Sequence, residues 1–370
     1  MTRPRAATDA NDEPPHVSVL LAVRNDVIYL KRCLAALKEQ DYPAGRLEVV
    51  IADGRSTDGT GTVIQDFSHR VPFRVEAVDN PSGGAATGFN AALRVARGTI
   101  IVLLGARALP AADFVSAGVR TLEETGADAA GGVVAGEASG IQAEAVALAL
   151  GSRFGVGDAH YRYASESGEV DTVNYGAYRR EVFEELGGFD ETMDNVEDDE
   201  FNYRLREAGK RLYLSPSISC QYSVRPSLIA LARQYGRYGY PKVRVLLRHP
   251  RQMRPRQFAP AALVGGLALT LIASARFGFV RRFFWLVAGL YAVATAIASG
   301  RIARRSGWRY LPLLAAAFAG MHLSYGAASL LGALRFGLLP ALLNRPDRSA
   351  IPRDLARPGV SIGNGSKAGR

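Results

Sequence analysis

Short apolar runs alternate with amphipathic stretches along the first third of the chain. Val17 to Val23 (VSVLLAV) is a run of the kind that forms a buried strand, and Leu47 to Ala52 is a second run that ends at Asp53. Between them, residues 29–40 place apolar side chains at helical spacing. The pattern therefore predicts a strand–helix–strand unit at the start of the domain.

The same alternation continues to residue 104. We expect helices over residues 59–68 and 85–96, and strands over residues 73–78 and 99–104. Such alternation predicts an α/β domain with a doubly wound, mainly parallel sheet. Ligands of open sheets bind beyond the carboxyl ends of the strands. The candidate site is therefore formed by three loops, Arg24 to Asp26, Asp53 to Asp58 and Gly105 to Ala108.

The last third of the chain is strongly apolar. Three stretches, 259–275, 283–299 and 310–334, are separated by arginine-bearing loops. About 17 residues is the lower limit for crossing a bilayer, so we expect about three transmembrane helices within residues 258–337. Basic flanks favour this interpretation over buried helices of a soluble domain. Four arginines between residues 248 and 256 indicate that the first flank is cytosolic, whereas the later loops leave the remaining orientation open.

Composition and charge narrow the function classes. The net charge of +10 suits anionic partners, and the arginines cluster around the apolar stretches, so we expect a membrane partner and no nucleic acid. Two cysteines, Cys33 and Cys220, occur without metal-ligand or disulfide spacing. Residues 1–15 lack the apolar core of a signal peptide and predict a disordered tail, and residues 344–370 predict a flexible tail.

Three polar clusters carry candidate chemistry. The stretch Asp53 to Thr60 combines glycines, which permit tight turns, with carboxylates that can accept hydrogen bonds from a base or a ribose. An ordinary strand-to-helix turn, with Asp58 near a helix N-terminus, explains the same residues. In the second cluster, Glu197 to Glu200, four consecutive acids can simply complement a helix dipole. Packed in a cleft, they would instead hold a raised pKa, a metal or a cationic partner, and a general base is one use of such a group.

The third cluster, Gln234 to Lys242, places aromatic rings and two positive charges just before the membrane region. Tyrosine and arginine favour the headgroup zone, so the cluster could be an interfacial anchor. As part of a site, Arg237 and Lys242 could neutralise a departing diphosphate.

Taken together, five motifs resemble those of family-2 inverting glycosyltransferases, in particular the succinoglycan-biosynthesis type. These motifs are VSVLLAVRND, DGRSTDGT, VNYGAYRREVFEELGGFDE, NVEDDEFNYRLREAG and RQYGRYGYPKVRVL. The resemblance covers residues 16–250 and implies a GT-A-like catalytic domain there. It further implies transfer of a sugar from a nucleotide-diphosphate donor to a lipid-linked or saccharide acceptor. The setting it implies is the bacterial inner membrane, with the protein multi-pass and its catalytic domain in the cytoplasm.

The resemblance assigns roles to individual residues. Asp198 is the expected base, Glu197 lies on the acceptor side and Tyr178 helps to shape the acceptor pocket. Gln234 and Arg237 match the family's QxxRW motif, with Tyr238 where tryptophan is usual. The expected nucleotide-binding residues are Val23, Arg24, Asn25, Asp26, Asp53, Asp58 and Arg107.

The chain departs from the family at the end of the fourth strand. Where the family has a DxD-like sequence that binds ribose and a divalent metal, this chain has Gly105-Ala106-Arg107. Mg²⁺ and Mn²⁺ prefer hard oxygen ligands, so the resemblance does not carry metal dependence over. Two accounts stay open. Either Arg107 pairs with the diphosphate directly, or the protein is a non-catalytic nucleotide-binding subunit of a polysaccharide assembly complex.

Overall fold

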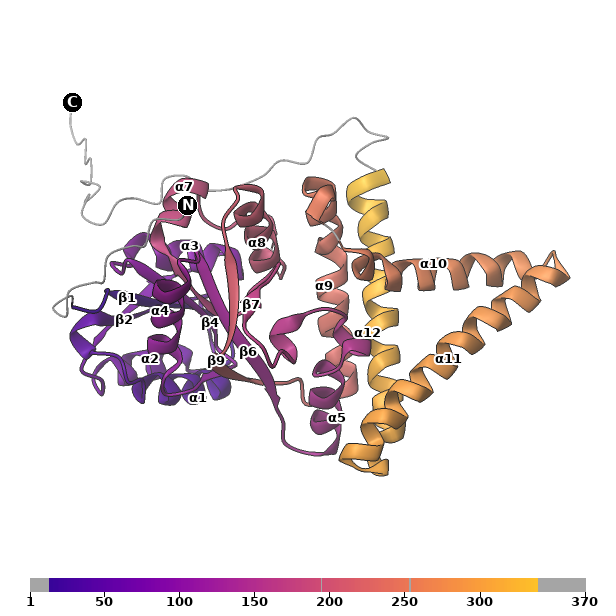
Figure 1. Cartoon of the computed structure of the whole chain (residues 1–370), viewed down its shortest axis with the longest axis horizontal. Helices are drawn as coiled ribbons and strands as arrows, with labels where there is room; N and C mark the ends of the chain where they lie inside the picture. Colours follow the sequence, from indigo (N-terminus) through magenta and orange to yellow (C-terminus); the bar gives the residue numbers. More distant parts are fainter. Residues whose placement is uncertain (1–12, 194, 253, 339–370) are drawn as a thin grey trace, which may run out of the picture.

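The structure, a computed structural model, describes residues 13–338 apart from 194 and 253. Within these residues a nine-stranded sheet has the order β3-β2-β1-β4-β8-β6-β9-β5, with β7 paired to β9 (Figure 1). The strands are β1 (Val17–Val23), β2 (Leu47–Asp53), β3 (Arg74–Asp79), β4 (Ile100–Gly105), β5 (Ala108–Pro110), β6 (Ala129–Glu137), β7 (Gly168–Glu169), β8 (Gly176–Arg179) and β9 (Leu212–Ser223). The predicted tails at 1–15 and 344–370 lie outside the described residues, apart from residues 13–15.

The first four strands form the predicted parallel part of the sheet. β1 pairs with β2 and β4 in parallel, and β2 pairs with β3 in the same sense. Val23 lies opposite Asp53, which in turn lies opposite Asp79, and Ala22 lies opposite Gly105. The carboxyl ends of these strands therefore meet at one edge, where the sequence predicted the candidate site.

The second half of the sheet is mixed. β8 lies antiparallel between β4 and β6, whereas β6 and β9 pair in parallel with a shift of register between Gly131 and Val133. A Cβ atom on Gly132 would overlap the carbonyl of Ile218 in β9, so only glycine permits this close approach. The fold is an α/β fold with a mixed sheet, and the parallel order predicted from the sequence holds for its first half.

Helices cover both faces of the sheet. Alternate residues of β1 face opposite sides of the sheet and belong to two different hydrophobic cores. Val19 and Leu21 pack in the core that includes α1, and Leu20 packs in the core that includes α3 and α8. The longer helices are α1 (Val27–Lys38), α2 (Thr60–Ser68), α3 (Ala85–Val95), α4 (Phe114–Thr125), α5 (Ile141–Leu150), α7 (Arg180–Leu186), α8 (Glu197–Glu207), α9 (Leu228–Arg248), α10 (Pro255–Ser274), α11 (Gly278–Ser306) and α12 (Leu311–Gly332). Short helical segments are α6 (Arg153–Val156), η1 (Ala44–Arg46), η2 (His160–Arg162), η3 (Pro250–Gln252), η4 (Trp308–Tyr310) and η5 (Ala333–Leu338).

The C-terminal helices form a separate layer beside the α/β domain. α9 and α12 lie side by side against the domain, while α10 and α11 project from it as a hairpin (Figure 1). Three segments are long and apolar enough to cross a membrane, Gln257–Ser274, Gly278–Ser306 and Trp308–Gly337, and they contain the three predicted apolar stretches almost completely. In the most apolar part of each segment, the share of buried residues is 33% for Trp308–Gly337. It is 0% for Gln257–Ser274 and 11% for Gly278–Ser306, the two segments of the hairpin.

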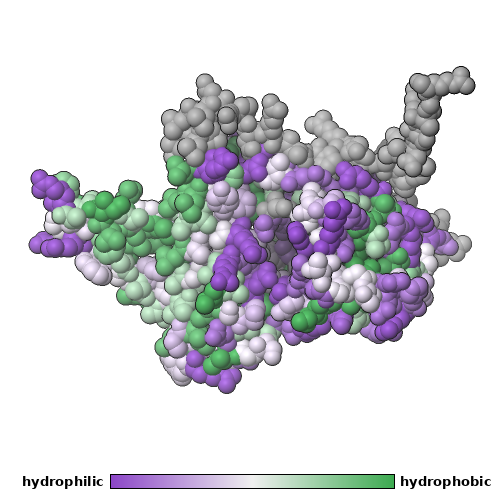
Figure 2. Space-filling view, turned by 180° about the vertical axis from the view of Figure 1, so that it is seen from behind, coloured by the Kyte–Doolittle hydropathy of each residue, from purple (hydrophilic) through white to green (hydrophobic). Residues whose placement is uncertain are grey.

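The hairpin exposes a broad apolar surface. Figure 2 shows hydrophobic residues covering its sides and hydrophilic residues at its tip. The exposed apolar side chains of α10 and α11 include Leu269, Leu271, Ile272, Phe279, Phe283, Trp285, Leu286, Leu290, Val293 and Ile297. A contiguous exposed surface of this kind marks a membrane or protein interaction site. The three helices therefore support association of the protein with a membrane.

Candidate active site

A cavity of about 750 Å³ lies between the carboxyl edge of the sheet and the layer of C-terminal helices. Its size is within the range of small-molecule binding sites. Ala22 and Gly105 line it from the ends of β1 and β4, and residues of the first turn of α8 line it as well. On the other side the wall comes from α9, α10, α11 and α12. The cavity therefore joins the predicted nucleotide edge to the predicted acceptor residues.

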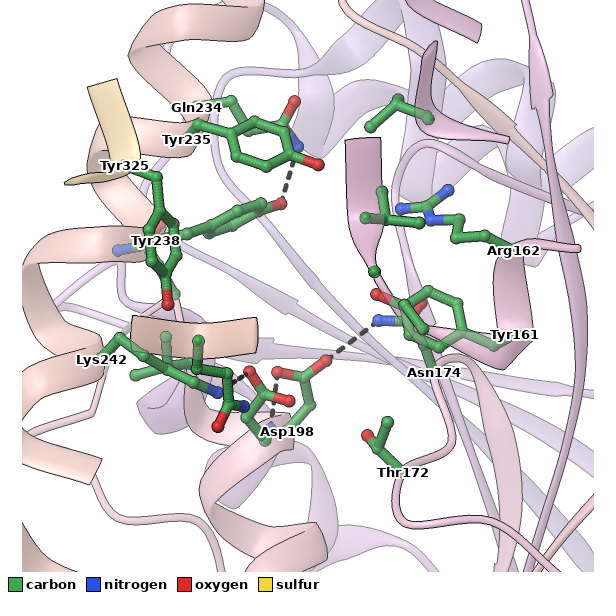
Figure 3. Close-up of a pocket in the computed structure, with 18 of the residues that line it drawn as sticks. Tyr161, Arg162, Thr172, Asn174, Asp198, Gln234, Tyr235, Tyr238, Lys242 and Tyr325 are labelled. Carbon is green, nitrogen blue, oxygen red and sulfur yellow. Dashed lines mark hydrogen bonds and ion pairs between the residues drawn. The ribbon is translucent and has the colours of Figure 1, made fainter. Parts of the chain in front are cut away.

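Asp198 lies in the first turn of α8 and lines the cavity (Figure 3). Acids at the start of this helix and Arg204 and Arg206 in its last turn complement the helix dipole, which explains why so acidic a sequence is helical. The Asp198 carboxylate accepts hydrogen bonds from Asn174 Nδ2 at 3.0 Å and from the Asp199 N–H at 2.8 Å. Burial, and next the charge of Asp199, raise the pKa of Asp198 to about 6. The group is suited to accept a proton near neutral pH.

An ion pair between a buried lysine and a partly exposed aspartate adjoins this carboxylate. Lys242 of α9 is 6% exposed, and its Nζ lies 2.5 Å from Asp199 Oδ2. Burial acts to lower the pKa of Lys242, but the Asp199 carboxylate and neighbouring oxygens outweigh it and the pKa is raised. Lys242 is therefore a fixed cation that ties α9 to α8. Glu197 is also buried at the cavity wall.

Gln234 holds the tyrosine that replaces the family's tryptophan. Its Nε2 donates to Tyr238 Oη at 2.6 Å and to Tyr222 Oη at 3.3 Å, while its Oε1 accepts from Arg225 Nε at 3.3 Å. The Tyr238 ring lines the cavity, as Figure 3 shows. Arg237 is exposed on the same helix and lines a separate shallow depression. The structure thus brings Gln234 to the cavity but not Arg237.

The loops after β1 and β2 are fastened to each other. Asn25 donates its backbone N–H to Ser56 Oγ at 2.9 Å and accepts from the Thr57 N–H at 2.8 Å. Asp53 accepts from the Ser56 hydroxyl at 2.6 Å, and Asp58 accepts from the Val27 N–H at 2.9 Å. The hydrogen bonds of Asp58, with Thr60 first and Val27 next, lower its pKa. The sequence-predicted residues Asn25, Asp53 and Asp58 therefore form one rigid ledge at the sheet edge.

Arg24 extends this ledge. It follows the buried Val23, whose carbonyl accepts from the Gly54 N–H at 2.8 Å. The Arg24 side chain is exposed and packs so closely over Gly54 and Gly83 that a Cβ atom at either glycine would collide with it. Gly83 also has φ +69°, a conformation that favours glycine. The arginine covers the floor of the predicted nucleotide site.

Arg107 is held by other side chains of the protein. Its Nε and Nη2 donate to the two oxygens of Asp26 at 3.0 and 3.2 Å, and its guanidinium lies 3.6 Å from the centre of the Tyr29 ring. Arg107 is not among the residues that line the cavity. The structure therefore brings Arg107 and Asp26 together as a pair, beside the nucleotide ledge.

The residues at the end of β4 do not fit a divalent metal. Gly105 has no donor side chain, and a Cβ atom there would lie 2.9 Å from Tyr175 Oη, so the tyrosine fills the space of a ligand. Ala106 is buried, and Arg107 carries a positive charge. Over the described part of the chain no three acidic, histidine or cysteine side chains are grouped as a metal site. Hard cations need several oxygen ligands, which the side chains of residues 105–107 do not supply.

Among the cavity residues, Tyr178 is predicted by the sequence analysis, whereas Asn174 and Arg162 are not. Tyr178 is at the wall as expected, but it is only 2% exposed and packs within an aromatic cluster with Phe183 and Phe201. Asn174 and Arg162, by contrast, point into the cavity on the wall opposite α9 (Figure 3). Arg162 lies in the aromatic segment HYRY between glycine-rich turns, a composition that could have marked a ligand-binding loop.

Comparisons with known proteins agree with this geometry. Residues 18–187 match the family "Glycosyl transferase family 2". The succinoglycan biosynthesis protein ExoA of Rhizobium meliloti is 30% identical over 271 residues, which cover 70% of this chain and 81% of that protein. A dolichyl N-acetyl-alpha-D-glucosaminyl phosphate 3-beta-D-2,3-diacetamido-2,3-dideoxy-beta-D-glucuronosyltransferase of Methanococcus voltae is 30% identical over 233 residues, 61% of this chain and 72% of that protein.

A solved structure has the same fold. A mannosyltransferase from Pyrobaculum calidifontis in complex with GDP-Man and Mn²⁺ superposes with a TM-score of 0.55 at 23% identity, over 86% of this chain and 90% of that chain. The sequence resemblance and the predicted GT-A-like fold are both confirmed. The protein belongs to glycosyltransferase family 2 and is a glycosyltransferase.

Proposed function

We propose that the protein transfers a sugar, with inversion, from a nucleotide-diphosphate donor to a hydroxyl group of a lipid-linked saccharide at the cytoplasmic face of the inner membrane. One observation carries the proposal. A carboxylate whose pKa is raised to about 6, that of Asp198, faces a cavity whose opposite wall is built from candidate membrane spans. A general base and a lipid-facing wall in one cavity suit an acceptor that stays anchored in the bilayer.

The proposed reaction is a single displacement. The acceptor hydroxyl oxygen attacks the anomeric carbon from the face opposite the diphosphate, and the new C–O bond forms as the bond to the β-phosphate oxygen breaks. The electron pair of the broken bond leaves with the nucleoside diphosphate. Asp198 takes the proton of the hydroxyl and later releases it to solvent. Attack from the opposite face inverts the configuration at the anomeric carbon.

The composition of the cavity wall supports a lipid-linked acceptor over a free polysaccharide. Apolar residues of the candidate spans, among them Pro260, Leu263 and Met321, line the cavity beside the polar His322 and Tyr325. His322 Nε2 lies 2.9 Å from the Phe154 carbonyl, which joins α12 to the catalytic domain. A lipid tail could leave the cavity along the apolar side while the saccharide reaches Asp198.

Release of nucleoside diphosphate by the purified protein in lipid tests the proposal. The donors are a panel of nucleotide sugars, and the acceptors are polyprenyl-diphosphate-linked saccharides. Each combination is measured in EDTA and in Mn²⁺, for wild type and for Asp198→Asn. We expect release that requires the lipid-linked acceptor and falls roughly 10²–10⁴-fold in Asp198→Asn, the range for loss of a general base. Thr172→Val is the matched control, because Thr172 lines the same wall and its hydroxyl accepts from Asn202 Nδ2. Full activity of Asp198→Asn would refute the proposal.

A further inference from the structure

One cation in the cavity has no carboxylate beside it. Arg162 belongs to η2, is partly buried and lines the cavity opposite α9 (Figure 3). Its Nη1 lies 3.4 Å from the Val134 carbonyl, and its guanidinium lies 5.2 and 5.5 Å from the ring centres of Tyr161 and Tyr222. Among the described residues no carboxylate lies within ion-pair distance of it. Its electrostatic surroundings are tyrosines, Tyr161, Tyr222, Tyr235 and Tyr238.

Two other cations near the site are paired, and Arg153, which also lines the cavity, is exposed to solvent. Lys242 is bonded to Asp199, and Arg107 is bonded to Asp26. A cation removed from water without a partner is costly, so a partly buried guanidinium among hydroxyl groups indicates an anion supplied by the ligand. A planar guanidinium can donate two parallel hydrogen bonds to phosphate oxygens, and tyrosine hydroxyls can donate further ones.

A short chain of aromatic contacts connects Arg162 to the end of β4. Its guanidinium is next to the Tyr222 ring, the Tyr222 and Tyr175 ring centres are 6.5 Å apart, and Tyr175 Oη lies against Gly105. Gly105 begins the segment where the family's DxD-like sequence would hold a divalent metal, and the residues there do not fit one. Two tyrosines therefore lie between Arg162 and the altered metal segment on one side of the cavity.

We infer that Arg162, with the tyrosine hydroxyls around it, binds the diphosphate of the sugar donor and replaces the divalent cation. The inference rests on the proposed function and names the group that stabilises its leaving diphosphate. As the anomeric C–O bond breaks, the electron pair passes to the β-phosphate oxygen, and the fixed guanidinium stabilises the added negative charge. The proton of the acceptor hydroxyl goes to Asp198, which lines the same cavity, and the diphosphate leaves unprotonated.

A phosphate group of a lipid-linked acceptor could use the same guanidinium, so the experiment separates the two sources. The probes are UDP and GDP, with uridine and guanosine as matched phosphate-free ligands, titrated into the full-length protein in lipid nanodiscs with EDTA. A second arm titrates the polyprenyl-diphosphate-linked saccharide alone. The variants are Arg162→Met and Arg162→Lys, and Arg153→Met is the control because Arg153 lines the same cavity and carries the same charge.

We expect wild type to bind one of the two nucleoside diphosphates in EDTA more tightly than its nucleoside. Arg162→Met should weaken that binding roughly ten- to hundredfold, the worth of about one charge-assisted hydrogen bond, without affecting nucleoside binding. Arg162→Lys should recover part of the loss, and Arg153→Met should bind as wild type does. Melting curves of each variant verify folding.

Two results would overturn the inference while leaving the proposed function intact. One is diphosphate binding that requires Mn²⁺ and is indifferent to Arg162. The other is a loss in Arg162→Met confined to the lipid-linked saccharide, which would assign the guanidinium to the acceptor. If folded wild type bound no nucleoside diphosphate under any condition and released none from a nucleotide sugar, the proposed function itself would fail.

Discussion

The hydrogen bond between Asn174 and Asp198 gives a quantitative prediction for the pH dependence of activity. Asn174 Nδ2 donates to Asp198 Oδ2 at 3.0 Å and stabilises the ionised carboxylate. Asn174→Ala removes this donor without changing a charge. The protonated form of Asp198 then becomes more favourable, so its pKa rises and the base is ionised only at higher pH.

The size of the shift follows from the strength of the bond. A hydrogen bond to a charged group contributes about 1.5–3 kcal/mol, and water entering the space of the lost side chain would restore part of it. A net loss of about 1.4 kcal/mol raises a pKa by about one unit. Starting from the pKa of about 6 for Asp198, the midpoint of the acid limb of the pH–activity profile should move to about pH 7. Activity should then fall about fivefold at pH 6, less than twofold at pH 7 and hardly at all at pH 8.

The assay is kcat/KM for nucleoside-diphosphate release between pH 5 and pH 9, with saturating acceptor. Thr172→Val should keep the wild-type acid limb, because the Thr172 hydroxyl is bonded to Asn202 Nδ2 and not to the Asp198 carboxylate. Equal losses in Asn174→Ala at every pH would refute the reasoning, since they would indicate a positioning defect and not a changed pKa.

Asp199→Asn makes the converse prediction. It removes the negative charge that, after burial, does most to raise the pKa of Asp198, and it leaves the positive charge of Lys242 nearby. The acid limb should therefore move below pH 6. Because Lys242 is buried and loses its carboxylate, the melting temperature should fall as well, although solvent at the partly exposed Asp199 makes the loss smaller than for a fully buried pair. An acid limb that moves upward in this variant would contradict the assignment of Asp198 as the titrating base.

Two further predictions concern stability and the nucleotide ledge. Burial acts to lower the pKa of His249, but hydrogen bonds to Glu200 and Glu207 outweigh it and raise the pKa. This contact should therefore stabilise the protein fully below pH 6.5 and lose its effect as pH rises through the raised pKa of His249. In wild type the melting temperature should fall over this pH interval, and in His249→Gln this fall should be smaller. Gly83→Ala should weaken nucleoside binding in titrations, because φ is +69° and the new methyl group would displace Arg24. Unchanged binding would exclude Arg24 from the ledge.

The parallel half of the fold and the acidic first turn of α8 could be predicted from the sequence. The apolar runs in β1, β2 and β4 are continuous because both faces of these strands are buried. Four consecutive acids before a helical run mark the first turn of α8, whereas the choice of Asp198 among them comes from the family resemblance. The β6 strand has the sequence AAGGVVAGE, in which small residues hide the apolar pattern, so pairing with β9 could not be predicted.

Charge pairing over long sequence separations explains the rest of the difference. Arg107 and Asp26 are 81 residues apart, and no local pattern indicates that they form an ion pair. For the same reason Arg162 carries no local signal of its place opposite α9, because that position depends on how η2 packs against β6 and β9. Sequence patterns identify which residues are charged, whereas the fold determines which charges are left for a ligand.

The configuration of the product at the anomeric carbon tests the central claim most directly. A donor with an α-linked sugar is converted with the lipid-linked acceptor, and the new linkage is assigned from the one-bond ¹³C–¹H coupling of the anomeric carbon by NMR. Direct displacement assisted by Asp198 predicts a β-linked product from wild type and none from Asp198→Asn. An α-linked product would contradict the account, because it would require two displacements or attack from the face of the departing diphosphate.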